Sequence, residues 1–111
     1  MNHIPSLVGL IRPMLFSWAL CLAGTALAAD QQTLYTQSLA ATCANCHGTQ
    51  GKGVHEGSVP GLAGLRADYI EAQMKAFKSG ERQATIMHQL SKGYSEEQIR
   101  QLAAYFASQK P

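Results

Sequence analysis

Several features are scarce in this chain of 111 residues, and each shortage narrows its possible roles. Charged residues make up only 14% of the sequence, with nine basic against seven acidic side chains. There is therefore no basic stripe of the kind that binds nucleic acid or anionic lipid. No stretch alternates polar and apolar residues for long enough to predict a β-sheet. Cysteine is also scarce, and two of the three cysteines fall in one short stretch.

That stretch is the most informative motif, because residues 43–47 read Cys-Ala-Asn-Cys-His. Cys-x-x-Cys-His is the attachment signature for c-type haem. Cysteines at i and i+3 project from one side of a helical turn, so each thiol can add to one of the two vinyl groups of the porphyrin. The imidazole of His47 then lies under the iron as its proximal ligand. The motif predicts one covalent haem c, held by Cys43, Cys46 and His47.

Two other chemistries use a Cys-x-x-Cys pair. A structural zinc site needs four Cys or His ligands in two closely spaced pairs, whereas His55, His88 and Cys21 are scattered along the chain. A thioredoxin-like dithiol needs a βαβ unit around it, and nothing in the flanking sequence resembles one. Haem attachment is favoured over both.

The first 28 residues have the order expected of a secretory signal. Arg12 supplies a weakly basic start, an apolar run follows over residues 14–22, and Ala26-Leu-Ala28 forms a small-x-small cleavage site. We expect cleavage after Ala28, with Ala29 as the alternative. The sequence thus predicts a signal peptide and a periplasmic mature protein.

The leader has one alternative role, that of an uncleaved membrane anchor. Its apolar stretch is shorter than the roughly 20 residues that span a bilayer, and Pro13 bounds it. We therefore expect no stable membrane insertion of the mature chain. Cys21 follows Leu20 rather than a small residue, which disfavours lipid modification and assigns Cys21 to the discarded leader.

Residues 29–111 are expected to form a single monohaem domain. Cleavage leaves 83 residues with a net charge of +1, which is too short a chain for a large core of its own. A covalent haem adds a large apolar surface that the protein can bury. We therefore expect the haem-free chain to be poorly folded.

The mature sequence predicts an all-α fold with three main helices around the haem. The first covers about residues 31–44 and ends in the haem motif, and the second covers about 67–78 and stops at Gly80. The last begins after Ser95, which forms an S-x-x-Q capping box with Gln98. A glycine-rich loop separates the first two helices, and a short helical segment is expected near residues 85–91.

Apolar residues at helical spacing predict which helix faces are buried. The inward face of the last helix consists of Ile99, Leu102, Ala103 and Phe106. The stripe of the second helix consists of Tyr69, Ile70, Met74 and Phe77. We expect the last helix to pack against the first through Leu34, Tyr35 and Ser38.

Haem iron takes a second axial ligand or leaves that position open. The mature chain has two methionines, Met74 and Met87. Met74 falls inside the stripe of the second helix, where methionine more often serves packing. Met87 lies 40 residues after His47, which is enough chain to reach the opposite haem face. Met87 is the favoured ligand, with His88 or an open site as alternatives.

These motifs together resemble a small bacterial class I cytochrome c. The resemblance rests on Cys43-Ala-Asn-Cys-His-Gly48, Val59-Pro-Gly-Leu62, Met87 and Ile99-x-x-Leu-Ala-Ala-Tyr-Phe106. Phe77-Lys-Ser-Gly-Glu81, Thr85-Ile-Met87 and Lys92-Gly-Tyr-Ser95 are similar to the cytochrome subunit of flavocytochrome c sulfide dehydrogenase.

The resemblance implies a class I cytochrome c fold with His47 and Met87 as axial ligands. It also implies that the Pro60 carbonyl accepts a hydrogen bond from the other His47 ring nitrogen, which orients the imidazole. The implied partners are a sulfide-oxidising flavoprotein, which donates electrons one at a time, and a downstream electron acceptor protein. Some members of that subunit family carry two haem domains, whereas this chain has one haem motif, so a free-standing carrier is the alternative.

Three functions fit this reading: a subunit of a sulfide-oxidising complex, a diffusible carrier serving an oxidase or reductase, and catalysis at the haem. Catalysis is disfavoured because His55 is expected to be exposed in the glycine-rich loop, and His88 is expected to be a surface or packing histidine. The nearly neutral charge favours the subunit over a carrier steered by a charged ring. The predicted function is periplasmic electron transfer, as an electron-transfer protein or a non-catalytic subunit rather than as an enzyme alone.

Overall fold

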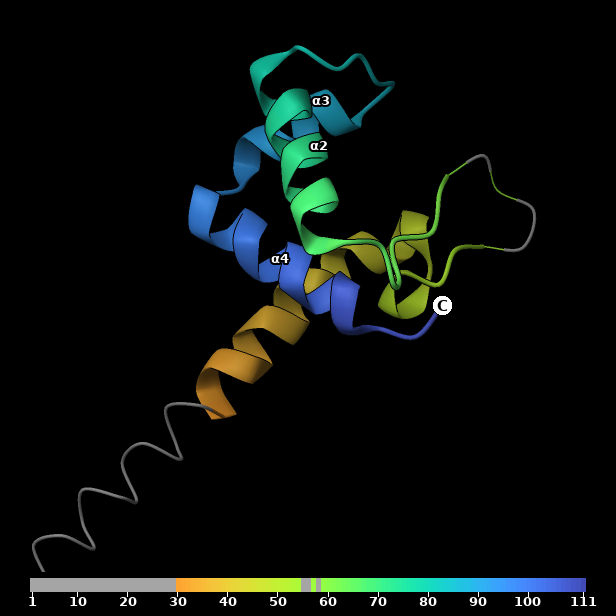
Figure 1. Ribbon diagram of the computed structural model, residues 1–111, viewed down its shortest axis with the longest axis vertical. Helices are drawn as coiled ribbons and strands as arrows, with labels where there is room; N and C mark the ends of the chain where they lie inside the picture. The colour runs from red at the N-terminus through yellow and green to blue at the C-terminus, as the bar shows by residue number, and fades with distance from the viewer. Residues whose placement is uncertain (1–29, 55–56, 58) are drawn as a thin grey trace, which may run out of the picture. The chain divides into compact units, whose positions relative to one another are not determined.

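The computed structural model of the chain describes residues 30–54, 57 and 59–111, and within these ranges it is built from helices without a β-strand (Figure 1). The predicted leader, with Cys21, and His55 lie outside the described residues. A helix over residues 30–47, called the signature helix below, contains the haem motif. The remaining elements are η2 (Thr49–Gly51), α2 (Ala67–Ser79), α3 (Met87–Leu90), η3 (Ser91–Gly93) and α4 (Glu96–Ser108). The all-α prediction is confirmed.

Helix α4 follows its sequence pattern closely. The Ser95 hydroxyl accepts from the Gln98 backbone N–H at 3.2 Å, and the Gln98 side chain accepts from the Ser95 N–H at 2.9 Å. This reciprocal pair satisfies two of the N–H groups that a helix start leaves open. The predicted inward face is buried, with Ile99, Leu102, Ala103 and Phe106 all at most 2% exposed. Both the start and the buried face of α4 are confirmed.

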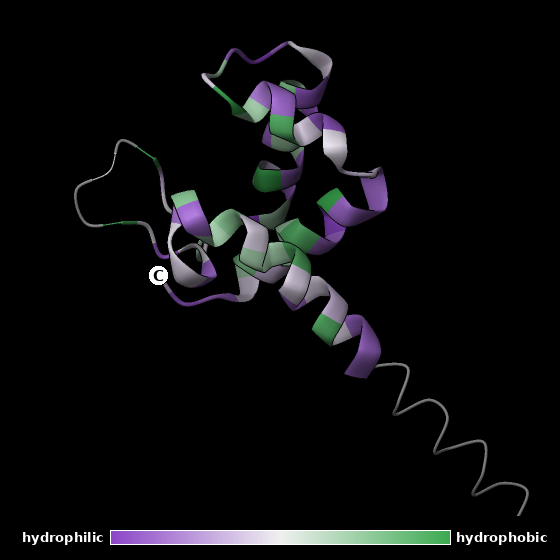
Figure 2. Cartoon of the chain, turned by 180° about the vertical axis from the view of Figure 1, so that it is seen from behind, coloured by the Kyte–Doolittle hydropathy of each residue, from purple (hydrophilic) through white to green (hydrophobic). Residues whose placement is uncertain are grey.

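Helix α2 ends where the sequence predicts, because Gly80 adopts a left-handed backbone with φ 86°. Its core-facing residue is Ile70, and Met74 packs against the same cluster. Tyr69 is 49% exposed, so its place in the apolar stripe was wrong. Helices α2 and α4 pack together. Figure 2 shows that the helices of the described part carry both hydrophobic and hydrophilic positions.

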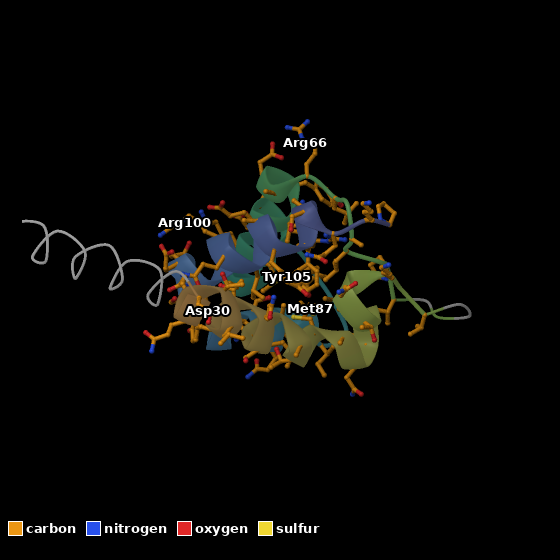
Figure 3. The ribbon with its side chains drawn as sticks, turned by 90° about the horizontal axis from the view of Figure 1, so that it is seen from below. Asp30, Arg66, Met87, Arg100 and Tyr105 are labelled. Carbon is orange, nitrogen blue, oxygen red and sulfur yellow. The ribbon has the colours of Figure 1, made fainter. Side chains whose placement is uncertain are left out.

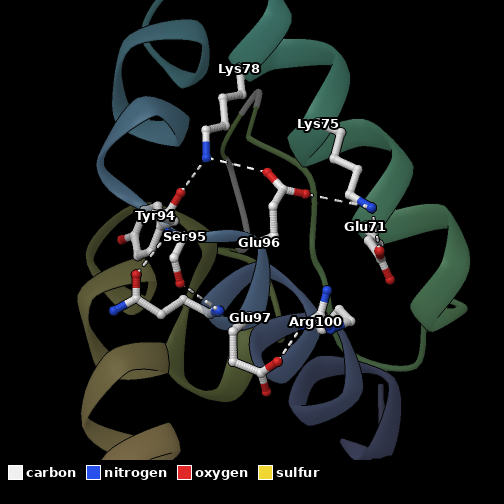
Figure 4. A network of polar contacts seen from close by, with 9 residues as sticks. Glu71, Lys75, Lys78, Tyr94, Ser95, Glu96, Glu97 and Arg100 are labelled. Atoms are coloured by element: carbon white, nitrogen blue, oxygen red, sulfur yellow. Dashed lines mark hydrogen bonds and ion pairs between the residues drawn. The ribbon is translucent and has the colours of Figure 1, made fainter.

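Polar contacts join α2 to the start of α4 (Figure 4). The Lys78 ammonium donates to the Tyr94 carbonyl at 2.6 Å and reaches a carboxylate oxygen of Glu96 at 3.3 Å. Lys75 lies 3.6 Å from the other Glu96 oxygen and 2.6 Å from Glu71. Glu96 thus accepts a hydrogen bond from Lys78 and forms an ion pair with Lys75, and both contacts link the beginning of α4 to α2.

The signature helix packs through a different face from the one predicted. Leu39, Ala40 and Cys43 contact the core, whereas Leu34 is 55% exposed and Ser38 is exposed. Tyr35 does reach α4, since its hydroxyl accepts from the Gln98 amide at 2.7 Å. The prediction was wrong for Leu34 and Ser38, because the buried face follows the positions that lead into the motif at helical spacing.

The apolar core is small. The buried apolar side chains of the described part are Ala40, Ile70, Ile99, Leu102, Ala103 and Phe106. Six large apolar residues of the described part are about half exposed: Leu34, Tyr35, Val54, Tyr69, Ile86 and Leu90. Among the described residues, no helix is both long and apolar enough to cross a membrane.

Candidate functional site

The haem motif occupies the last turn of the signature helix. The helix runs to His47, three residues further than predicted, and the Gly48 N–H closes it on the Ala44 carbonyl at 2.9 Å. Cys43 is half-buried and Cys46 is exposed, and neither is in a disulfide. Burial raises the pKa of the Cys43 thiol above its ordinary value. The two thiols thus share one helical turn, as two thioether bonds to a single porphyrin require.

The chain reverses directly after the motif, and only glycine fits at the reversal. Gly48 has φ 81°, and a Cβ built there would lie 2.2 Å from the Gly53 carbonyl oxygen. This close approach lets the Gly53 N–H donate to the His47 carbonyl at 2.8 Å. The loop is thereby pinned to the end of the signature helix.

A second loop segment docks on the first at Gly51. The Gly51 carbonyl accepts from the N–H groups of Leu62 and Ala63 at 2.6 and 2.9 Å. Gly61 lies against the same carbonyl, which a Cβ would approach to 3.2 Å. These contacts bring the chain at Pro60 back to the end of the signature helix, which it left about a dozen residues earlier.

The result is a hydrogen bond between His47 and Pro60. His47 Nδ1 lies 2.7 Å from the Pro60 carbonyl oxygen, and His47 is only 9% exposed. A carbonyl can only accept, so Nδ1 carries the proton and donates it. In the neutral imidazole the lone pair is then on Nε2, which no hydrogen bond engages within the described part of the chain. Nε2 is therefore free to bind a metal.

The two methionines lie in different surroundings. Met74 packs against the core from α2, and its sulfur accepts from the buried Ser91 hydroxyl at 3.6 Å. Met87, labelled in Figure 3, is the half-buried first residue of α3 and is not part of the core cluster. His88 is half-buried beside it, and its buried Nδ1 has no hydrogen-bond partner among the described residues. Among the described residues, the Met74 sulfur thus has a hydrogen-bond donor and a place against the core cluster, and Met87 is not part of that cluster.

These residues fit a porphyrin better than a bare metal ion. The described residues contain no group of three or more Cys, His, Asp or Glu side chains that could hold a metal ion. Ile86 and Leu90, on either side of Met87, are 56% and 47% exposed, and Val54 beyond the motif is 47% exposed. A porphyrin that covered these side chains would remove from water apolar surface that is otherwise exposed.

Sequence reasoning missed one contact at this site. The Tyr94 hydroxyl lies 3.1 Å from Thr42 Oγ1, and Thr42 directly precedes Cys43. Tyr94 falls in a stretch that contributes to the family resemblance, but no local pattern pairs it with a residue 52 positions away. Only the closed fold reveals this pair.

Residues 28–110 match the sequence profile of the family described as cytochrome c. This chain belongs to the cytochrome c family. The family relationship and the motif mean that this cytochrome carries one covalently attached haem c and serves electron transfer. Its fold is that of a class I cytochrome c.

The cytochrome is similar to several proteins of known name. Cytochrome c-554(548) of Halomonas halodenitrificans is 40% identical over 72 residues, which are 62% of this chain and 86% of that protein. The cytochrome subunit of sulfide dehydrogenase of Chlorobaculum tepidum is 39% identical, and the match covers 63% of this chain and 62% of that protein. The thiosulfate dehydrogenase electron acceptor of Stutzerimonas stutzeri is 39% identical, and the match covers 78% and 42%.

A solved structure shows the same relationship. Cytochrome c4 of Acidithiobacillus ferrooxidans is 41% identical with a TM-score of 0.56, and the match covers 60% of this chain and 37% of that one. The cytochrome thus spans most of the Halomonas protein but less than two thirds of the other three chains.

Proposed function

We propose that Cys43 and Cys46 bind the haem through thioethers and that His47 and Met87 are the axial iron ligands. The observation that carries this proposal is the 2.7 Å hydrogen bond from His47 Nδ1 to the Pro60 carbonyl. It leaves Nε2 as the free ring nitrogen and holds the ring in one orientation, as the proximal histidine of a haem requires. The bound haem supplies an iron that cycles between Fe(II) and Fe(III).

The protein residues act by keeping the ligand set the same in both oxidation states. The Pro60 carbonyl retains the proton on Nδ1 and raises the electron donation from Nε2 of His47. Burial of His47 limits the access of water to the ring. The doubly tied loop after the motif restrains Pro60 itself. A rigid site of this kind transfers an electron without a large rearrangement of the protein.

Met87 is the better candidate than Met74 for the sulfur ligand. The Met74 sulfur already accepts from Ser91, and its side chain fills space between α2 and the core. Met87 lies outside that cluster and is flanked by the half-exposed Ile86 and Leu90. A thioether ligand raises the reduction potential and suits electron transfer.

Residues 1–28 are proposed to be a signal peptide, which leaves residues 29–111 as a periplasmic domain. The proposal rests on the weakly basic start, the short apolar run and the small-x-small site before Ala29. Haem attachment also fits an exported protein. In an oxidising compartment, free Cys43 and Cys46 would be at risk of oxidation to a disulfide, and thioether bonds to the haem occupy both thiols.

The proposed donor is a dehydrogenase of reduced sulfur compounds, with the sulfide-oxidising flavoprotein of the predicted complex as the first candidate. One similar protein is named as a subunit of sulfide dehydrogenase and another as the electron acceptor of thiosulfate dehydrogenase. A diffusible carrier is the second candidate, favoured by the match to most of the length of cytochrome c-554(548). In either case a further protein accepts the electron.

The ligand assignment is tested by a matched pair of substitutions in the haem-loaded protein. Met87→Ala should abolish the red charge-transfer absorption of methionine-ligated ferric haem and lower the reduction potential by about 100 mV or more. Met74→Leu keeps the volume of a packing residue and should leave both unchanged. The reverse pattern would show that Met74 is the ligand.

The donor is tested by purifying the tagged cytochrome from its native cells and identifying what accompanies it. A stoichiometric flavin-containing partner, with reduction of the haem on addition of sulfide, supports the sulfide dehydrogenase assignment. Reduction by thiosulfate with a different partner supports the second sulfur-oxidising system. A lone haem protein reduced by neither would support the diffusible carrier.

A further inference from the structure

Tyr94 and Thr42 make a directional contact across the fold. Thr42 Oγ1 donates to the Leu39 carbonyl at 2.7 Å, and a hydroxyl has only one proton to donate. The Tyr94 hydroxyl, 3.1 Å from Thr42 Oγ1, must therefore be the donor in their hydrogen bond. This bond connects the segment before α4 to the residue that precedes Cys43.

Three other contacts hold Tyr94 in place. Its carbonyl accepts from the Lys78 ammonium of α2 at 2.6 Å, and its N–H donates to the Ser91 carbonyl at 3.3 Å. Ser91 is completely buried, and the Tyr94 side chain packs against the core. The hydroxyl is thus a donor on a restrained support, which limits the entropy lost on forming its bond.

Each residue of the contact lies on a chain segment that also carries one of the two proposed iron ligands. Thr42 belongs to the signature helix that ends at His47, and Tyr94 follows η3, which continues directly from α3 and Met87. We propose that the Tyr94–Thr42 hydrogen bond is a clasp that holds the Met87 segment against the signature helix, so that Tyr94 is a positioning residue for the methionine ligand. This inference rests on the proposed ligation by His47 and Met87.

The clasp is tested in the haem-loaded ferric protein with imidazole, which competes with methionine for iron. Tyr94→Phe removes only the hydroxyl and should tighten imidazole binding roughly two- to tenfold, the factor corresponding to the net contribution of one hydrogen bond. Tyr105→Phe is the matched control, because Tyr105 also packs against the core and its hydroxyl makes no hydrogen bond among the described residues. It should leave the binding constant unchanged.

Two further variants test Thr42, which accepts the hydrogen bond from Tyr94. Thr42→Val should tighten imidazole binding as Tyr94→Phe does, whereas Thr42→Ser keeps the hydroxyl and should behave like the parent protein. Combining Thr42→Val with Tyr94→Phe should add little to either change, because both remove the same bond. Additive effects would overturn the clasp, and Thr42→Val alone decides the question if Tyr94→Phe does not fold.

The Met87→Ala background separates the clasp from the ligand assignment. With no methionine left to compete, Tyr94→Phe should have no further effect on imidazole binding, and a persisting effect would overturn the clasp. A purely structural role would lower the unfolding temperature and leave the imidazole constant unaltered, which also overturns it. If Met87→Ala itself changes neither the spectrum nor the imidazole affinity, Met87 is not an iron ligand. The proposal that Tyr94 positions it as a ligand is then wrong as well.

Discussion

At the scale of single residues, glycines and hydrogen-bonding side chains determine the geometry of the haem motif. Gly48 allows the reversal that lets Pro60 return to His47, and the Pro60 carbonyl then sets the proton on Nδ1. The sequence predicts the helical placement of the motif because its spacing is local. It does not predict that Thr42 has a partner 52 residues away, since no local pattern records that closure.

Three glycine substitutions should separate backbone strain from steric clash. Gly48→Ala combines φ 81° with a Cβ 2.2 Å from a carbonyl oxygen, so it should cost about 3 kcal/mol or more and greatly reduce the yield of haem-loaded protein. At Gly80 the backbone has φ 86°, but an added Cβ would meet no atom within 4 Å, so Gly80→Ala introduces strain without a clash. It should lower the free energy of unfolding by about 1–2 kcal/mol, or Tm by roughly 4–16 °C. Gly93→Ala, with nothing within 4 Å, should be nearly neutral.

Thermal unfolding of the haem-loaded variants, followed by far-UV circular dichroism, measures this order. A Gly48→Ala protein as stable as Gly93→Ala would contradict the loop geometry. Equal losses for the variants at Gly48 and Gly80 would show that strain alone matters and that the contact with Gly53 relaxes.

At the scale of elements, α4 is the most predictable part of the chain. Its capping box and its apolar spacing are both local, so its start at Ser95 and its buried face follow from the pattern. The signature helix is less predictable, because several apolar residues compete for the inward position. Packing selects Leu39 and Ala40, and it leaves Leu34 exposed.

The ion-pair network between α2 and α4 should be sensitive to acid. Hydrogen bonding to Lys78 lowers the pKa of Glu96, with further contributions from the charges of Lys78 and Lys75. A carboxylate with a lowered folded-state pKa stabilises the fold above its unfolded-state pKa, and this stabilisation is lost as the pH falls through the folded-state value. Glu96→Gln should lower Tm by a few degrees at most near pH 7, and this difference should shrink as the pH falls below the ordinary pKa of a glutamate.

Glu81→Gln is the control for this titration, because Glu81 forms no ion pair within the described part of the chain. The measurement is the difference in Tm between each variant and the parent protein across the acid range. A Glu96→Gln difference that grows on acidification would have the wrong sign and would contradict the role of the network. A salt-dependent difference near neutral pH would agree with the exposure of these groups.

At the scale of the whole molecule, the small core makes the fold dependent on its cofactor. Only six apolar residues of the described part are buried, while Val54, Ile86 and Leu90, which are close in sequence to the proposed haem ligands, remain half exposed. The covalently attached haem supplies the apolar surface that these side chains can cover. Folding and haem attachment are therefore expected to be coupled.

The haem-free chain should accordingly lack a cooperative thermal transition. Producing the protein without cytochrome c maturation, or as the double variant Cys43→Ala and Cys46→Ala without added haem, gives the sample for far-UV circular dichroism. The haem-loaded protein should melt sharply, and the haem-free chain should show a broad change with reduced helix content. A sharp transition at a comparable temperature would show that the protein core suffices by itself.

The sequence by itself determined the haem c chemistry, the helical class, the boundaries of α2 and the start of α4, because spacing, caps and glycine stops act over a few residues. The tertiary structure decided which face of the signature helix is buried, which sulfur is occupied by packing and which hydroxyl Tyr94 meets. Those outcomes depend on segments far apart in the chain that come together only when the fold closes, and no local pattern encodes which pairs will meet.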